Sequence, residues 1–148
     1  MLPSLVEYER LMYTLPDRYP SIRQSTLVLV RRGATFAELN GVVELESEIT
    51  LIVWEDLDFA QGMIQGYSYA VDRRGERLYW YDPQPHPNDP TLASTFPHHK
   101  HVPPDPSASS GQNIKRNRIP APNIGFDHPN LPVLIEEIER DLLSIQPS

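Results

Sequence analysis

Two neighbouring stretches decide the fold of this chain: MIQGYSYAV at residues 63–71 and ERLYWY at residues 76–81, separated by DRRG at residues 72–75. Both stretches are rich in β-branched and aromatic residues, which favour extended strands. The segment between them contains a glycine, which accepts the positive φ angles of tight turns. The sequence therefore predicts a β-hairpin, and Asp82 lies where its second strand ends.

Further extended runs lie upstream of this hairpin. STLVLV at residues 25–30, the stretch at 35–44 and ITLIVW at residues 49–54 each have the composition of a strand. Together with the hairpin they predict an α+β domain with a mostly antiparallel sheet of about four to six strands between residues 22 and 82.

Helical periodicity is confined to the two ends of the chain. Apolar residues from Leu2 to Met12 recur at helical spacing and predict a helix over residues 4–14. Asn130, with Pro132 in the first turn, predicts a second helix that reaches Leu143. Both helices are expected to pack against the sheet.

The composition is that of one intracellular domain. A chain of 148 residues can bury a sizeable core, so we expect a single domain over residues 1–148. It contains no cysteine, which excludes disulfides and thiolate chemistry. The N-terminus has neither a basic start nor an apolar run, so we expect no signal peptide and a cytoplasmic location.

Prolines are concentrated in the second half of the chain. Of 16 prolines, 12 lie between Pro83 and Pro132, which predicts a long Pro- and His-rich loop over residues 83–132. We expect Leu92 and Phe96 to anchor its first part on the sheet, and residues 104–113 to be mobile or to fold with a partner.

All five histidines also lie in this region, and four of them are clustered between residues 86 and 101, at His86, His98, His99 and His101. Three interpretations are open. The histidines could be acid–base groups that cleave RNA without a metal, with Asp82 orienting one of them; they could bind a divalent ion together with Asp82; or they could hold the loop in place by hydrogen bonds. In an extended segment, alternation places His99 and His101 on one side and His98 on the other.

Candidate substrate-binding residues surround these histidines. The net charge of −7 opposes general binding of nucleic acid, but the segment from His98 to Arg118 has four basic residues and a single acidic one. The four are Lys100, Lys115, Arg116 and Arg118. Aromatic residues on the hairpin could stack bases or could be packing pairs; the candidates are Tyr67, Tyr69 and Tyr81.

Several enzyme classes have no support in the sequence. There is no nucleophile elbow, Walker loop, dinucleotide-binding glycine pattern or HExxH sequence. The spacing of the histidines and Asp82 matches no strong zinc signature. We therefore expect no obligatory metal or other cofactor.

Three strings together resemble the TumE-like toxin family of bacterial toxin–antitoxin modules. They are Tyr67-Ser68-Tyr69, the pair Tyr81-Asp82 followed by Pro85-His86, and Phe96-Pro97-His98-His99-Lys100-His101. The resemblance extends over about residues 20–142. Pro83 and Pro87 depart from the family's pattern, whereas the string from His98 to His101 matches in full.

The resemblance implies a toxin that inhibits growth and is neutralised by a cognate helix-turn-helix antitoxin. We expect such a toxin to act on RNA as a metal-independent ribonuclease. The catalytic candidates are His98, His99, His101, Asp82 and His86, and Lys100 is the candidate phosphate contact. The alternative is a non-enzymatic module that binds nucleic acid or a protein through the same basic loop. No membrane partner is expected, and a homo-oligomer is possible.

Overall fold

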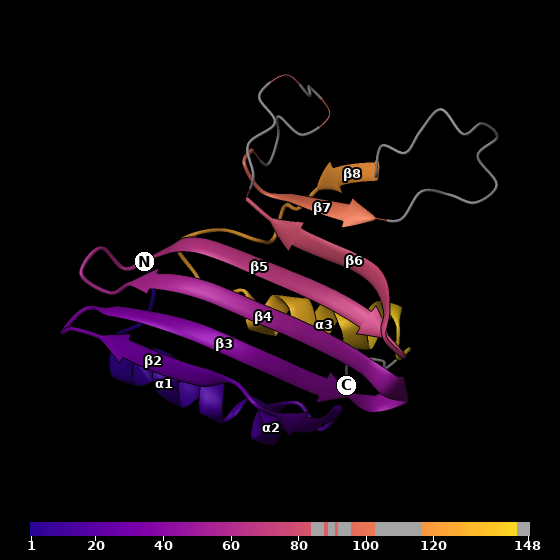
Figure 1. Ribbon diagram of the computed structural model, residues 1–148, viewed down its shortest axis with the longest axis horizontal. Helices are drawn as coiled ribbons and strands as arrows, with labels where there is room; N and C mark the ends of the chain where they lie inside the picture. The colour runs from indigo at the N-terminus through magenta and orange to yellow at the C-terminus, as the bar shows by residue number, and fades with distance from the viewer. Residues whose placement is uncertain (84–87, 89–90, 92–95, 103–116, 145–148) are drawn as a thin grey trace.

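The computed structural model describes residues 1–83, 88, 91, 96–102 and 117–144. Within these ranges the chain forms three α-helices, one 3-10 turn and eight strands (Figure 1). In chain order they are α1 (Leu5–Tyr13), α2 (Leu15–Arg18), β1 (Ile22–Ser25), β2 (Val28–Arg32), β3 (Phe36–Leu45), η1 (Glu46–Glu48), β4 (Ile49–Asp58), β5 (Met63–Arg73), β6 (Glu76–Asp82), β7 (His99–Val102), β8 (Asn117–Pro120) and α3 (Leu131–Asp141).

The eight strands of the described chain form one sheet. Its order is β1-β3-β4-β5-β6-β7-β8, and β2 pairs with β3 beside β1. Each of these neighbouring pairs is antiparallel. The predicted α+β class and antiparallel sheet are confirmed, as is the hairpin formed by β5 and β6.

The sheet has more strands than the expected four to six, because β7 and β8 lie in the region predicted to be loop; the other six lie between residues 22 and 82. β7 occupies the proline-free stretch between Pro97 and Pro103, so its backbone N–H groups are available to a ladder. β8 ends the strand order, and an edge strand tolerates a proline such as Pro120. The prediction of loop was wrong for these two segments.

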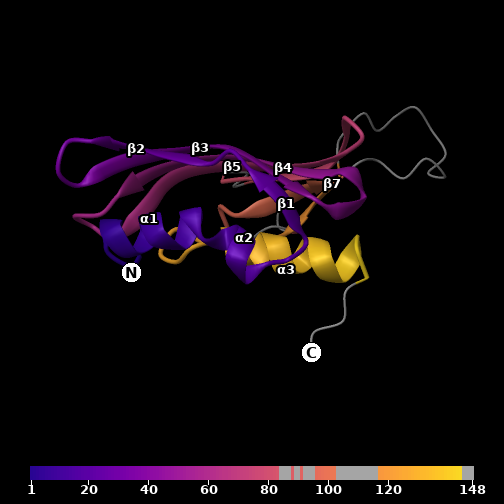
Figure 2. The ribbon, with the colours of Figure 1, turned by 90° about the horizontal axis from the view of Figure 1, so that it is seen from below.

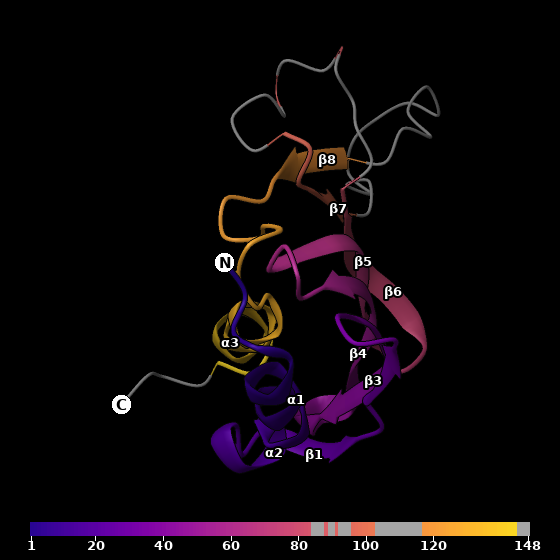
Figure 3. The ribbon, with the colours of Figure 1, turned by 90° about the vertical axis from the view of Figure 1, so that its left-hand side faces the viewer.

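All three helices of the described chain lie on one face of the sheet (Figure 2). Helix α1 begins after Ser4, whose hydroxyl accepts a hydrogen bond from the Glu7 N–H, and it buries Tyr8 and Met12. Helix α3 has Pro132 in its first turn and buries an apolar stripe consisting of Leu131, Leu134, Ile135 and Ile138. Figure 3 shows α1 and α3 side by side along the concave face of the curved sheet.

A buried carboxyl group lies among these elements. Glu55 on β4 is fully buried and accepts hydrogen bonds from the hydroxyls of Tyr8 on α1 and Tyr69 on β5. The Tyr69 hydroxyl in turn accepts a bond of 3.0 Å from the Asn130 amide. Burial raises the pKa of Glu55 to about 7, against the opposing effect of the bonds from Tyr69 and Tyr8. This polar cluster connects the sheet to α1 and to the start of α3.

Phe96 does not anchor the loop as expected, because 49% of its surface is exposed. Leu92 and residues 104–113, the other parts of that expectation, lie outside the described residues. Among the helices that the structure describes, none is long and apolar enough to cross a membrane.

Candidate functional site

The pairing of β6 with β7 separates two sets of side chains. Trp80 lies opposite His101, Tyr81 opposite Lys100, and Asp82 opposite His99. Residues directly opposite each other in an antiparallel pair point to the same face of the sheet. Lys100 contacts α3, so it points to the helical face. Asp82, His99 and His101 therefore point to the opposite face.

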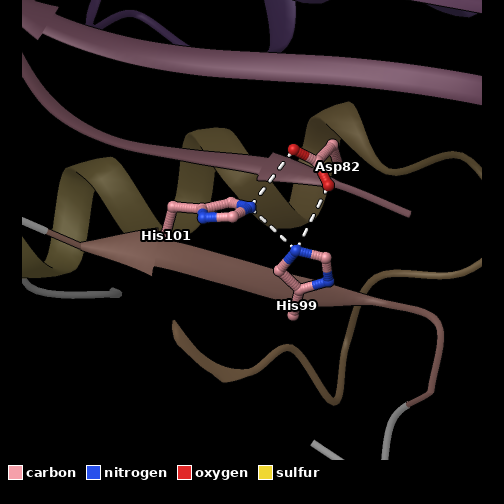
Figure 4. A group of neighbouring side chains, drawn as sticks. All are labelled: Asp82, His99 and His101. Carbon is pink, nitrogen blue, oxygen red and sulfur yellow. Dashed lines mark hydrogen bonds and ion pairs between the residues drawn. The ribbon is translucent and has the colours of Figure 1, made fainter. Parts of the chain in front are cut away.

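These three residues, called the His–Asp cluster below, converge on one point (Figure 4). The Nε2 atoms of His99 and His101 are 2.7 Å apart. One carboxylate oxygen of Asp82 lies 3.2 Å from Nε2 of His99, and the other lies 3.2 Å from Nε2 of His101. The two Nε2 atoms and the two carboxylate oxygens, all of which can bear lone pairs, thus lie close to one another.

Access to the His–Asp cluster is from the side of Asp82. The His99 side chain is 1% exposed and that of His101 is 10% exposed, whereas the Asp82 side chain is 26% exposed. Asp82 is the last residue of β6, where the strand leaves the sheet. A substrate in solution can therefore contact the carboxylate while the imidazoles remain largely shielded from water.

The orientation of His99 is set by a backbone group. Its Nδ1 atom lies 3.0 Å from the carbonyl oxygen of Pro97. A carbonyl oxygen can only accept, so Nδ1 carries the hydrogen of this bond. In a neutral ring the Nε2 atom then carries a lone pair, and that atom is the one directed at His101 and Asp82.

Two further side chains flank the His–Asp cluster on its own face of the sheet. The Trp80 ring stacks on the His101 ring at 4.6 Å between centroids, and Arg118 on β8 lies opposite His101 in the ladder. Arg118 was a candidate from the sequence. Trp80 was not, although strand alternation places it on the same side as Asp82 and could have revealed it.

Lys100 belongs to the other face. Its ammonium group lies 3.0 Å from the Glu137 carboxylate of α3 and 3.9 Å from the centre of the Tyr79 ring. The Tyr81 hydroxyl donates a bond of 2.6 Å to the same carboxylate. This arrangement ties β7 to α3, and sequence reasoning did not identify Glu137 as a partner because it is 37 residues away.

His98 also lies apart from the His–Asp cluster. Its Nδ1 atom is 2.7 Å from the Tyr67 hydroxyl, and its ring packs on Phe126. The pKa of His98 is lowered mainly by burial and secondly by the charge of His128. Burial, and next the charge of Asp82, raise the pKa of Tyr67, so its phenol keeps the proton that it can donate to His98.

The remaining candidates divide into buried residues and residues that are not described. Tyr67, Tyr69 and Tyr81 are each at most 2% exposed, so packing describes their rings better than base stacking. His86, Lys115 and Arg116 lie outside the described residues.

The structure removes the reason for expecting no metal. That expectation rested on spacing along the chain, whereas the ligand atoms of Asp82, His99 and His101 come within 4.8 Å of one another through strand pairing. Two imidazoles and a carboxylate are a donor set found in transition-metal sites.

The fold and the site define a small α+β protein with a polar His–Asp centre at one end of an antiparallel sheet. Comparison with known families gives a match over residues 12–141 to the family described as Toxin TumE. The match covers most of the chain, which therefore belongs to the TumE toxin family. This membership indicates a toxin of a toxin–antitoxin system and with it an antitoxin partner. Neither the curated proteins nor the solved structures gave a match.

Proposed function

We propose that this toxin acts by cleaving RNA and that the His–Asp cluster is its reactive centre. The observation that carries the proposal is the convergence of the Asp82 carboxylate with Nε2 of His99 and Nε2 of His101, within 3.2 Å of one another. Groups that exchange protons near neutral pH are what phosphodiester cleavage requires.

The surroundings of the cluster favour RNA as the substrate. Arg118 lies opposite His101 on β8, on the same face, and a guanidinium matches the geometry of a phosphate. Lys115 and Arg116 precede it in the sequence. Trp80 provides a half-buried indole beside His101, suited to contact with an unpaired base. A local basic segment can recruit RNA although the whole chain is acidic.

RNA also supplies its own nucleophile. In the proposed reaction the ribose 2′-oxygen attacks the adjacent phosphorus and the bond from phosphorus to the 5′-oxygen breaks. The proton of the 2′-hydroxyl passes to the cluster, and the 5′-oxygen receives a proton. The products are a 2′,3′-cyclic phosphate and a 5′-hydroxyl. Arg118 stabilises the negative charge on the phosphoryl oxygens.

The proposed partner is a helix-turn-helix antitoxin, as the family resemblance of the histidine string implies. Such an antitoxin would neutralise the toxin by binding it. Coexpression of the adjacent reading frame, if it encodes such a protein, should restore growth and copurify with this chain.

The direct test is incubation of purified full-length protein with a single-stranded RNA and with the DNA of the same sequence, each with and without added Zn²⁺, Mn²⁺ or Mg²⁺. We expect the RNA to be cleaved, with cyclic-phosphate ends, and the DNA to stay intact. The matched variant is Asp82→Asn, which keeps the side-chain size and removes the charge. RNA that stays intact under all conditions, from protein that still arrests growth, would refute the proposal and favour the binding module.

A further inference from the structure

We infer that Asp82, His99 and His101 form a binding site for one divalent transition-metal ion, of which Zn²⁺ is the representative. The inference deepens the proposed function, on which the catalytic role of the ion rests. The binding of the ion itself depends only on the three side chains.

The separations within the cluster suit such an ion. A tetrahedral Zn²⁺ with bonds of about 2.0–2.1 Å to nitrogen and oxygen holds its ligand atoms about 3.3 Å apart. Each carboxylate oxygen of Asp82 lies 3.2 Å from the Nε2 atom of a different histidine, and one ligand atom from each of the three residues lies within 4.8 Å of the others. The distance of 2.7 Å between the two Nε2 atoms must widen by roughly 0.6 Å, which small side-chain rotations provide.

The protonation of His99 points to the same conclusion. The bond to the Pro97 carbonyl places the ring hydrogen on Nδ1, so neutral His99 directs a lone pair at the Asp82 carboxylate. Two acceptors in this position repel each other. A cation between them turns the repulsion into coordination.

The groups that orient the two histidine rings resemble those found around metal sites. Metal-binding histidines usually donate their second N–H to a carbonyl or carboxylate, and His99 does so to Pro97. Trp80 stacks on His101 and restricts its ring. Imidazole ligands select Zn²⁺, Fe²⁺ or Ni²⁺ over Mg²⁺ and Ca²⁺, which prefer oxygen ligands.

An ion held in this way would define the base of the proposed reaction. Zinc lowers the pKa of a bound water to about 7, so a hydroxide is present on it near neutral pH. Held by Asp82, His99 and His101, the ion would supply a base for the proton of the ribose 2′-hydroxyl. The Asp82 edge, as the exposed side of the cluster, is where a phosphate oxygen would approach.

The test is a titration of the full-length protein, stripped of metal by a chelator, with Zn²⁺ in a calorimeter, and with Co²⁺ by visible absorption. We expect one ion per chain. Asp82→Asn and His101→Gln should each weaken the affinity by more than about 100-fold, beyond the 10- to 100-fold typical of losing an outer-shell partner. Circular dichroism and thermal melting establish that the variants are folded.

The control is His128→Gln. His128 Nδ1 also lies 3.2 Å from a carboxylate, that of Asp127, but this exposed pair does not belong to the cluster. The control should bind one ion with unchanged affinity. Wild-type protein that takes up no stoichiometric Zn²⁺ or Co²⁺, or equal binding by folded Asp82→Asn and His101→Gln, would overturn the inference. Because no RNA is present, these outcomes are separate from those that test the proposed function.

Discussion

The Nε2 atoms of His99 and His101 lie 2.7 Å apart, because both side chains leave β7 on the same side and turn toward the end of β6. Asp82 lies opposite His99 and faces both rings. One carboxylate therefore contacts two imidazoles, and the loss of any member changes the charge and hydrogen bonding of the other two.

The first prediction concerns toxicity. Asp82→Asn and His101→Gln should each lower the rate of RNA cleavage by about 10²- to 10⁴-fold and abolish growth arrest, because each removes a group of the reactive centre. The measurement is single-turnover cleavage, together with growth after induction at matched protein levels. His128→Gln serves as the folded control. Variants of Asp82 and His101 that remain fully toxic at wild-type abundance would show that the cluster is not the reactive centre.

The second prediction concerns Arg118, which lies opposite His101. Arg118→Gln should weaken binding of RNA and reduce the slope of log affinity against log salt by about 0.7, the value for one lost phosphate contact on a single strand. Binding of Zn²⁺ should not change, because Arg118 is not one of the three ligands. Fluorescence anisotropy with labelled RNA across a salt series gives the slope. An unchanged slope would remove Arg118 from the phosphate site.

The third prediction concerns the pair formed by Lys100 and Glu137, whose side chains are 16% and 19% exposed. Because the pair is largely shielded from water, the effects of Lys100→Met and Glu137→Gln on the free energy of unfolding should not be additive. We expect a coupling energy on the order of 1–2 kcal/mol in a double-mutant cycle. Urea unfolding of the wild type, the two single variants and the double variant supplies the four free energies. Additive effects would mean that the ion pair does not stabilise the attachment of β7 to α3.

The fourth prediction concerns pH and the buried carboxyl of Glu55. Its pKa is raised from an ordinary value of 4.5 to about 7, so between these values the folded state binds more protons than the unfolded state. The free energy of unfolding should therefore fall as the pH rises through this window, by on the order of 3 kcal/mol, and level off above it. Urea unfolding from pH 4.5 to 8 measures this trend.

Glu55→Gln is the control for that experiment, because the amide does not titrate. The difference in stability between the wild type and this variant should depend on pH in the same window. Parallel curves for the two proteins would contradict the raised pKa. The hydroxyls of Tyr8 and Tyr69 can both hydrogen-bond the Gln side chain, which keeps the variant close to the native structure.

Local patterns in the sequence predicted much of the sheet and part of the site. The hairpin of β5 and β6 and helices α1 and α3 follow from periods of two and 3.6 residues, which depend only on near neighbours in the chain. The same alternation places His99 and His101 on one side of an extended segment, as the structure has them. The density of prolines, by contrast, wrongly suggested that the surrounding region has no strands.

The tertiary structure alone decided which of these residues meet. Asp82 reaches the two histidines only because β6 and β7 pair in one register, across a separation of 17 residues to His99. A shift of that register by one residue would have placed Lys100, not His99, beside Asp82. Lys100 lies on the other face of the sheet, where it forms an ion pair with Glu137 of helix α3. The sequence determined the local elements and the sidedness of the histidines; pairing and register, which arise from packing of the whole core, decided the composition of the site.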